Sequence, residues 1–309
     1  MNKKNMTHKN KPLEQGRCHH IKILGIGDSG LKSIQFLQDQ SALKKSQTLS
    51  FAVAHAQKNC LGSKQEVELI LVDPKNIDTD NTKSQNNLLG LAKIYPEGVQ
   101  GQSILFIVVD LSDTAYHSFV KNFLERHNKM LNKQYELIIG IACGSTQEEG
   151  NKNLNYGDGI LQQCDLIIPN DRKNNRMLSY ESTYQSIWFF INVLMRPGMI
   201  ISSFADVRHC ISTVNTGVII SADATGCNRT KSALQGVHKK IELIKKQQRN
   251  TEITAVIIDM CTADLSISEF DEVGQVIVGA LPKAVYYSIG VTTDDYLQNT
   301  LQINVLVMS

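Results

Sequence analysis

The chain has no excess of charge of either sign. Its 32 Lys and Arg residues and 30 Asp and Glu residues leave a formal net charge of +2 over 309 residues. This balance excludes binding to nucleic acid or to a membrane surface that depends on overall charge. Basic residues do gather between His238 and Lys246. Apolar residues interleave with them at spacings of three and four, which predicts the solvated face of a helix.

Long hydrophobic runs and a secretory leader are also missing from the sequence. The longest apolar run, from Ile187 to Met195, is interrupted by Asn192 and is too short to span a bilayer. The first twenty residues are rich in Lys, Asn and His and have no apolar centre of the kind found in signal peptides. We therefore expect a soluble, cytoplasmic protein that begins with a flexible tail.

Paired cysteine motifs are absent as well. The seven cysteines are scattered, odd in number and never arranged as C-x-x-C. This usage is typical of reduced thiols in a cytosolic protein and excludes a disulfide framework. The segment Cys18-His19-His20 has no second cluster at metal-ligand spacing, so we predict no metal site formed by the protein alone.

What the chain does have is a series of short apolar segments separated by polar or helical ones. Buried strands that alternate with crossings predict a parallel, doubly wound sheet. The expected strands of this sheet are 21–26, 51–54, 69–72, 104–109, 137–142 and 166–168. The polar stretch 73–102 predicts a surface loop.

The second half of the sequence changes pattern. Apolar and aromatic residues at spacings of three and four over 177–194 predict one long helix that packs along the sheet. Beyond Arg196, the sequence predicts a smaller α/β domain with a mixed sheet. Its expected strands are 216–221, 254–261, 284–290 and 301–307, with helices near 228–248 and 268–280.

A glycine-rich turn follows the first strand, as Gly25-x-Gly27-x-x-Gly30. In form this matches the fingerprint of dinucleotide-binding proteins, so an NAD(P)-binding oxidoreductase is one interpretation. Such an enzyme places an acid near the end of the next strand to hold the ribose. That strand ends in Ala54-His55-Ala56-Gln57, without an acid, which disfavours this alternative.

Several further segments keep a shared order along residues 20–308. The stretch Arg196–Arg208 reads R-P-G-M-I-I-S-S-F-A-D-V-R. The others are Glu149-Gly150, the I-P-N-D of Ile168–Asp171, Ala224-x-Gly226-x-x-Arg229, and Glu269–Gly274. This series resembles the FtsZ/tubulin superfamily. The resemblance implies a Rossmann-type, parallel-sheet nucleotide-binding domain that a long central helix joins to the smaller domain. We expect a tail (1–20), the nucleotide-binding-type domain (21–171), the central helix (172–195) and the C-terminal α/β domain (196–309).

The resemblance also implies where a guanine nucleotide would bind and which acid would act on it. Asp206, on a loop that completes the neighbouring subunit's site in a filament, is the implied catalytic acid. The implied nucleotide-binding residues are Gly25, Gly27, Asp28, Ser29, Gly30, Lys32, Thr114, Ala115, Tyr116, Glu149, Asn153 and Glu181.

The sequence departs from the family at both of these places. The family's glycine-rich signature after the strand at 106–109 is replaced by Asp110–Ser118, which contains no glycine, so β-carbons block close approach to phosphate. An acid about 4 Å from a phosphate charge costs on the order of 4 kcal/mol at an effective dielectric of about 20, although Mg²⁺ would offset part of this. In the acidic loop, Ile201 and Ser203 replace two of three polar groups, and Asp206 is equally suited to capping a helix.

We therefore expect an FtsZ-like cytoskeletal or cell-division protein that associates with itself or with another FtsZ-like subunit. Its binding and hydrolysis of GTP are expected to be weakened or lost. The alternative is a divergent but active GTPase that binds through Gly25–Lys32. The chain stops at Ser309, directly after the last expected strand, where family members continue into a tail that recruits membrane anchors. We expect no direct membrane binding by that route.

Overall fold

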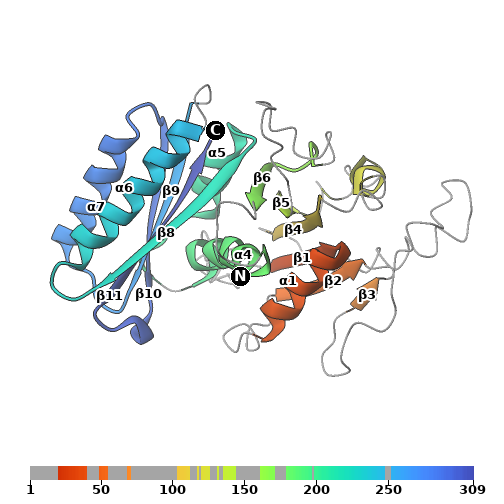
Figure 1. Ribbon diagram of the computed structural model, residues 1–309, viewed down its shortest axis with the longest axis horizontal. Coiled ribbons are helices and arrows are strands. Elements are labelled where there is room, and N and C mark those ends of the chain that lie inside the picture. The colour runs from red at the N-terminus through yellow and green to blue at the C-terminus, as the bar shows by residue number, and fades with distance from the viewer. Residues whose placement is uncertain are drawn as a thin grey trace, which may run out of the picture.

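The computed structural model describes residues 20–39, 49–54, 68–70, 103–111, 117, 120–125, 131, 135–143, 161–170, 179–196, 198–247 and 252–309. Two β-sheets lie on either side of one long helix, α4 (Ser179–Met195) (Figure 1). Within the described part of the chain, no helix combines the length and hydropathy that crossing a bilayer requires.

The first sheet has six strands, and every pair of neighbours is parallel. Its strands are β1 (His20–Ile26), β2 (Leu49–Ala54), β3 (Glu68–Ile70), β4 (Ser103–Asp110), β5 (Leu137–Cys143) and β6 (Leu166–Asn170). They are ordered β3-β2-β1-β4-β5-β6, the order of a doubly wound sheet. Every residue of β4 and β5 is buried, as in a parallel sheet covered on both faces. The predicted parallel sheet is confirmed.

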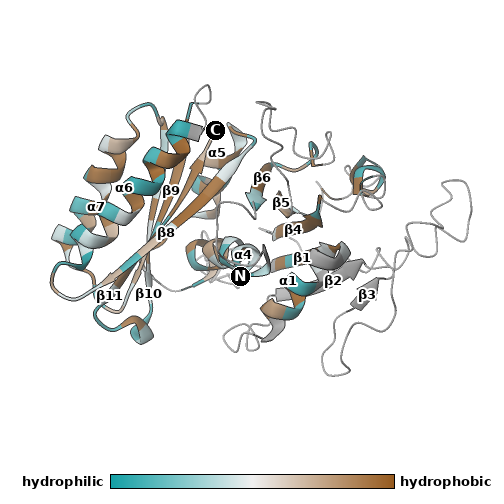
Figure 2. Ribbon diagram, viewed as in Figure 1, coloured by the Kyte–Doolittle hydropathy of each residue, from teal (hydrophilic) through white to brown (hydrophobic). Residues whose placement is uncertain are grey.

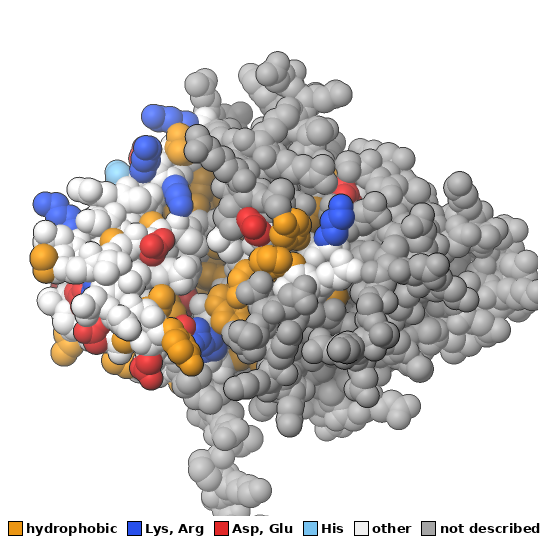
Figure 3. Space-filling view, turned by 60° about the horizontal axis from the view of Figure 1, so that its bottom comes forward, with side chains coloured by type: hydrophobic (Ala, Val, Ile, Leu, Met, Phe, Trp, Pro, Cys, Tyr) orange, Lys and Arg blue, Asp and Glu red, His pale blue; other side chains and the backbone are white. Residues whose placement is uncertain are grey.

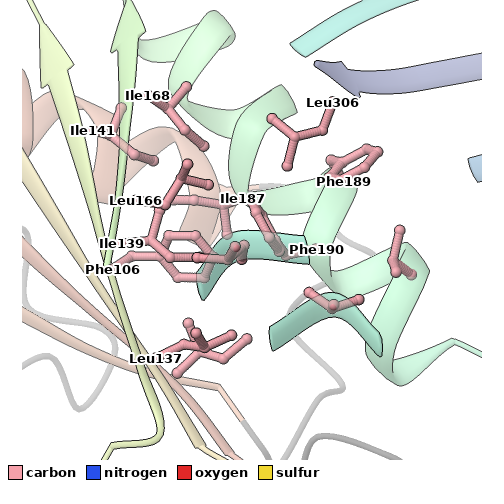
Figure 4. Packing of buried hydrophobic residues seen from close by; sticks show 14 of the residues in the cluster. Phe106, Leu137, Ile139, Ile141, Leu166, Ile168, Ile187, Phe189, Phe190 and Leu306 are labelled. Atoms are coloured by element: carbon pink, nitrogen blue, oxygen red, sulfur yellow. The ribbon is translucent and has the colours of Figure 1, made fainter. Parts of the chain in front are cut away.

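Helix α4 packs its apolar side chains against both sheets at once. On one side, Phe190 lies edge-on to Phe106 of β4, with ring centroids 5.5 Å apart. On the other side, the same core cluster includes Ile257 and Leu306 of the second sheet. Figure 4 shows side chains from the two sheets converging on the helix. The spacing of three and four in the sequence therefore corresponds to a helix that is buried on more than one face.

The second sheet is mixed and has the order β7-β10-β9-β11-β8. Only β9 and β10 run parallel, and the other neighbouring pairs are antiparallel. Its strands are β7 (Gly198–Ile200), β8 (Gly217–Thr225), β9 (Ala255–Thr262), β10 (Tyr286–Thr293) and β11 (Thr300–Met308). This arrangement confirms the predicted α/β fold with a mixed second sheet.

Helices cover both faces of the second sheet. On the outer face lie α6 (Arg229–Gln247) and α7 (Ile267–Ala280), and on the inner face lie α4 and α5 (Phe204–Ser212) (Figure 1). Leu234, Val237 and Ile241 of α6 are buried against the strands, while the Lys residues of this helix remain largely at the surface. Figure 2 shows the same division, with hydrophobic residues along β8 and β9 and hydrophilic residues on α6.

The stretch Arg196–Arg208 is more regular than its sequence suggests. It contains the short edge strand β7, which the sequence did not predict, and the first half of α5, the helix that Asp206 was expected to cap. The other named elements are α1 (Gly27–Asp39) and a short 3-10 helix, η3 (Asp295–Leu297), and residues 120–125 are helical as well. The loop predicted over 73–102 lies outside the described residues.

Candidate functional site

The order of the first sheet reverses between β1 and β4. In doubly wound sheets, ligands bind in the crevice outside the carboxyl ends of the strands at this reversal. Ile26 pairs in register with Val109, so Gly27 and Asp110 follow at the same level at the ends of the two strands. The topology alone thus places a candidate ligand site at the glycine-rich turn.

Gly27 gives this turn its shape. Its φ of 76° lies in the left-handed region, which glycine adopts without the steric cost that a side chain imposes. Helix α1 begins at the same residue, so its first backbone N–H groups point toward the carboxyl edge and favour an anion there. Asp28 and Ser29 supply the backbone of this first turn, and Lys32 lies exposed one turn further on.

The other two glycines of the turn are used for packing. A β-carbon on Gly25 would lie 2.6 Å from the carbonyl oxygen of Gly30. One on Gly30 would lie 2.7 Å from the carbonyl carbon of Gly25 and 3.0 Å from the oxygen of Val108. Gly25 and Gly30 therefore allow α1 to press against β1 and β4. Their presence is explained without a phosphate.

Asp110 ends β4 beside this turn and is 5% exposed. The backbone N–H of Leu111 donates to the carbonyl of Cys143, 2.7 Å away, and the ring Nε2 of His117 donates to the carbonyl of Leu111 at 3.0 Å. Thr114, Ala115 and Tyr116 lie outside the described residues, as do Glu149 and Asn153. The roles predicted for these five residues remain predictions.

A buried polar cluster joins the ends of β5 and β6 to the start of α4. The side-chain amide of Asn170 donates to Thr183 Oγ1 at 2.9 Å, and Cys143 Sγ lies 3.4 Å from the same oxygen. Glu181 is half-buried in the first turn of α4, two residues before Thr183. Sequence analysis did not single out Asn170 and Thr183 as site residues, although Asn170 belongs to the I-P-N-D segment.

Asp206 begins α5 as part of a capping box. Ser203 is the residue that caps the helix, and its Oγ accepts from the backbone N–H of Asp206 at 3.1 Å. In return, Asp206 Oδ2 accepts from the backbone N–H of Ser203 at 3.2 Å and from its hydroxyl at 2.6 Å. This reciprocal arrangement satisfies N–H groups that a helix start would otherwise leave unpaired. The capping role considered from sequence is therefore the one that the described contacts display.

Strand β7 and the loop that follows it expose a run of apolar side chains. Met199, Ile200 and Ile201 are 55%, 41% and 45% exposed. The next residue, Ser202, is buried, and its Oγ accepts from Ser288 Oγ of β10 at 2.9 Å. One anchored serine thus fixes the loop while three apolar side chains face solvent. Hydrophobic side chains also gather in a band across the middle of the face shown in Figure 3.

Known proteins resemble this chain in both sequence and structure, although no family model matches it. The cell division protein FtsZ of Pseudomonas putida is 26% identical over 307 residues, which cover 93% of this chain and 75% of that protein. FtsZ of Coxiella burnetii is 26% identical over 173 residues, or 52% of this chain and 43% of that protein. This chain thus matches less than half the length of one relative and three quarters of the other.

Solved structures agree with the sequence relatives. An FtsZ dimer of M. jannaschii matches with a TM-score of 0.67 at 17% identity, over 94% of this chain and 88% of that one. A TubZ protofilament of Bacillus thuringiensis matches with a TM-score of 0.61 at 9% identity, over 94% and 88%. In sequence and in fold, the chain is therefore similar to members of the FtsZ/tubulin superfamily.

Two of the segments that suggested this superfamily prove to be partners. Arg229 donates from Nε to Glu269 Oε1 at 2.8 Å and from a terminal nitrogen to Oε2 at 3.1 Å, the forked geometry that carboxylates accept best from arginine. Asp264 takes a third bond from the same guanidinium at 2.8 Å. The bonds from Arg229, with further hydrogen bonds from Ser266 and Thr230, hold the pKa of Glu269 down at about 2. The two segments therefore join the starts of α6 and α7 of this FtsZ-like fold.

No cluster of three or more His, Cys, Asp or Glu side chains suited to a metal ion occurs among the residues that the structure describes. At the carboxyl edge, the described groups are a helix start, one left-handed glycine and a buried aspartate. A guanine nucleotide would be held there by the backbone of Gly27–Gly30, with Lys32 near enough in sequence to face its phosphates. Asp110 would oppose it.

Proposed function

We propose that this FtsZ-like protein acts by association, with itself or with another FtsZ-like subunit, as a cytoskeletal or cell-division component whose binding and hydrolysis of GTP are weakened or lost. The observation that carries the proposal is the segment from β7 to the first turn of α5. Its acid, Asp206, is engaged in a capping box, and the adjacent side chains Met199–Ile201 are apolar and exposed.

The apolar loop supports association. Met199, Ile200 and Ile201 are adjacent and exposed, so a partner that removes them from water lowers the free energy of the complex. The anchor between Ser202 and Ser288 holds them in place beforehand, which reduces the entropy that binding would cost. Two of the structural neighbours are a dimer and a protofilament, so related folds do assemble through their subunits.

The carboxyl edge supports weak nucleotide binding. Gly25 and Gly30 are occupied with the packing of α1, and Asp110 brings a carboxyl group to the end of β4. A charge of the same sign as phosphate would cost on the order of 4 kcal/mol at about 4 Å, a loss of roughly three powers of ten in affinity. Mg²⁺ bound with the nucleotide would offset part of this cost.

A divergent, active GTPase is the second candidate, and one observation favours it. Gly27 keeps a left-handed turn directly before the start of α1, at the reversal of strand order, where backbone N–H groups can bind phosphate. Asp206 would then be the acid supplied to a neighbouring subunit. The third interpretation, an NAD(P)-dependent oxidoreductase, has no counterpart among the relatives named above.

Assembly measured by light scattering, with and without GTP and Mg²⁺, tests the proposal. We expect scattering that does not require nucleotide and that falls at least about tenfold in Ile201→Asp, which places a charge in the apolar loop. Leu243→Asp is the matched control, because Leu243 is 50% exposed but lies on α6. It should assemble like the parent.

The opposite result would favour the GTPase. Assembly that requires GTP, together with turnover that disappears in Asp206→Ala, would contradict the proposed loss of nucleotide chemistry. Because Asp206 also caps α5, the same variant must first be shown to remain folded by circular dichroism.

A further inference from the structure

A fully buried carboxyl group lies on the inner face of the second sheet. Asp259 belongs to β9 and has no exposed surface. Alternate residues of this strand point to opposite faces. Val256 and Ile258 pack beneath α6 and α7, whereas Ala255 and Ile257 belong to the core around α4. Asp259 shares the face of the second pair, so it points toward α4.

Three neutral side chains surround this carboxyl group. Thr292 of β10 donates to Oδ1 at 2.8 Å, Asn304 of β11 donates to Oδ2 at 3.2 Å, and Asn192 of α4 donates to Oδ2 at 3.4 Å. Asn192 is the one partner of the three that lies outside the sheet. The carboxyl group is therefore a point at which α4 is bonded to the second sheet.

Thr292 connects the same two elements in another way. Its hydroxyl lies 2.8 Å from Asp259 Oδ1 and also 3.3 Å from the backbone carbonyl of Asn192. A hydroxyl has one proton to donate. An ionised Asp259 competes for that proton, whereas a neutral Asp259 can donate its own proton to Thr292 and leave the hydroxyl to bond the carbonyl of α4.

The positive charge that acts on Asp259 belongs to Arg196, whose hydrogen bonds go to other residues. Arg196, at the end of α4, forms an ion pair with Asp294 at 3.0 Å and donates to Asn192 Oδ1 at 3.3 Å. Its guanidinium carbon also lies 5.7 Å from the centre of the Trp188 ring. Arg196 thus acts on Asp259 through space and through Asn192.

Burial raises the pKa of Asp259 above its ordinary range, and the hydrogen bonds from Thr292, Asn304 and Asn192 and the charge of Arg196 only partly oppose this. Burial also raises the pKa of Cys261 to about 12, so this thiol stays neutral. The elements packed against β9 carry other titratable or charged groups. These are Tyr180, Glu181 and Tyr184 of α4, Asp206, Arg208, His209 and Cys210 of α5, Tyr286 and Tyr287 of β10, and Asp294, Asp295 and Tyr296 at η3.

We propose that Asp259 is an ionisable latch between α4 and the second sheet. The neutral carboxyl group lets Thr292 bond the carbonyl of Asn192, and ionisation withdraws that bond and loosens the C-terminal end of α4. Strand β7 and Ile201, which carry the exposed side chains of Met199–Ile201, follow this end of α4, so the latch sets how firmly that segment is held. This inference does not depend on the proposed function.

The direction of the effect follows from the raised pKa. A carboxyl group whose pKa is raised in the folded protein contributes stability that is fully present below the ordinary pKa of Asp, about 3.9. That contribution is lost as pH rises through the higher, folded value. Solution more acidic than the folded pKa of Asp259 should therefore tighten the junction between α4 and the sheet, and solution above that pKa should loosen it.

The chain contains a built-in reporter, because Trp188 is its only tryptophan and lies beneath Arg196. We expect Trp188 fluorescence in the full chain to show one midpoint above the ordinary Asp range. Asp259→Asn should abolish this midpoint. Asp294→Asn should lower it, because Arg196 then has no competing carboxylate. Asp271→Asn, on the exposed side of α7, should leave it unchanged.

Amide hydrogen exchange keeps the proposal testable if a variant fails to fold. In the parent chain, exchange over 190–196 is divided by exchange in α6 to remove the intrinsic effect of pH. As pH rises from the ordinary Asp range through the folded pKa of Asp259, this ratio should rise about tenfold for each pH unit that separates the two values. Thr292→Val should exchange as fast below the midpoint as the parent does above it. A midpoint that survives in Asp259→Asn, or a flat exchange ratio in the parent, would overturn the latch.

Discussion

Two helices in the second half of the chain begin with a capping box, but among the described residues the acid of one box has a cationic partner and the acid of the other does not. Helix α5 starts with Ser203 and Asp206, and α7 starts with Ser266 and Glu269, each as a reciprocal capping box. Glu269 also receives the forked pair from Arg229 and is held as an anion. Asp206 has no such cation in the described contacts. The comparison shows that an acid in a family-like motif can be fully accounted for by local helix geometry.

Removing the cation from α7 should have the largest effect. Arg229 is 8% exposed, and Arg229→Ala would leave Glu269 in the same place without its partner. We expect the free energy of unfolding to fall by about 3–5 kcal/mol in urea titrations. Lys231→Ala, an exposed neighbour on α6, should change it by less than about 0.5 kcal/mol. Equal effects for both variants would show that the pair between Arg229 and Glu269 adds no special stability, and the contrast with Asp206 would then fail.

Lowering the pH should remove the stabilisation from the Arg229–Glu269 pair while Arg229 stays in place. The pKa of Glu269 falls to about 2 beside Arg229, against about 4.3 for an ordinary Glu. Its stabilisation is thus complete above the ordinary value and is lost as pH falls toward about 2. We expect the stability gap between the parent and Glu269→Gln to shrink by about 1–3 kcal/mol between about pH 5 and about pH 2.5. A gap that is constant with pH would show that Arg229 does not control this carboxylate.

The two capping serines sharpen the comparison at a smaller scale. Ser203→Ala and Ser266→Ala should each lower the free energy of unfolding by about 1 kcal/mol, because each removes the acceptor for a helix N–H. Thr at either position should retain most of that stability. If Ser203→Ala had no effect on unfolding, the capping account of Asp206 would fail, and a role for its carboxylate in binding would gain ground.

The smallest effect is expected at the exposed pair that links α5 to the first sheet's domain. Arg208 lies 3.4 Å from Glu136, and the two side chains are 58% and 37% exposed. Solvent and salt weaken such pairs, so Arg208→Ala should cost less than about 1 kcal/mol in the same urea titration. A larger loss would mean that α5 depends on this contact more than on its capping box.

Periodicity was enough to predict the long elements from sequence. The helices through Ile187 and Leu234 follow apolar residues at spacings of three and four, and the strands around Ile104 and Leu137 follow short continuous apolar runs that are buried throughout. The short strand β7 was missed because three residues show no period, and it exists through pairing with β10 rather than through its own sequence. The spacing of residues within a short segment does not predict which distant strand it pairs with.

The candidate site was predicted less completely than the fold. The glycine turn was located because glycine marks a left-handed position, yet its sequence could not separate Gly27, which shapes the turn, from Gly25 and Gly30, which pack. The cluster of Asn170 and Thr183 forms between distant segments, as does the network around Asp259. Such clusters form only when the fold brings distant segments together, so the spacing within one segment does not predict them.

The nucleotide content of the purified chain tests the central claim most directly. The protein would be purified without added nucleotide, denatured, and the released small molecules separated by ion-exchange chromatography. The account predicts GTP and GDP far below one equivalent per chain, because Asp110 and the packed glycines leave few groups for phosphate. Recovery of about one guanine nucleotide per chain would contradict it.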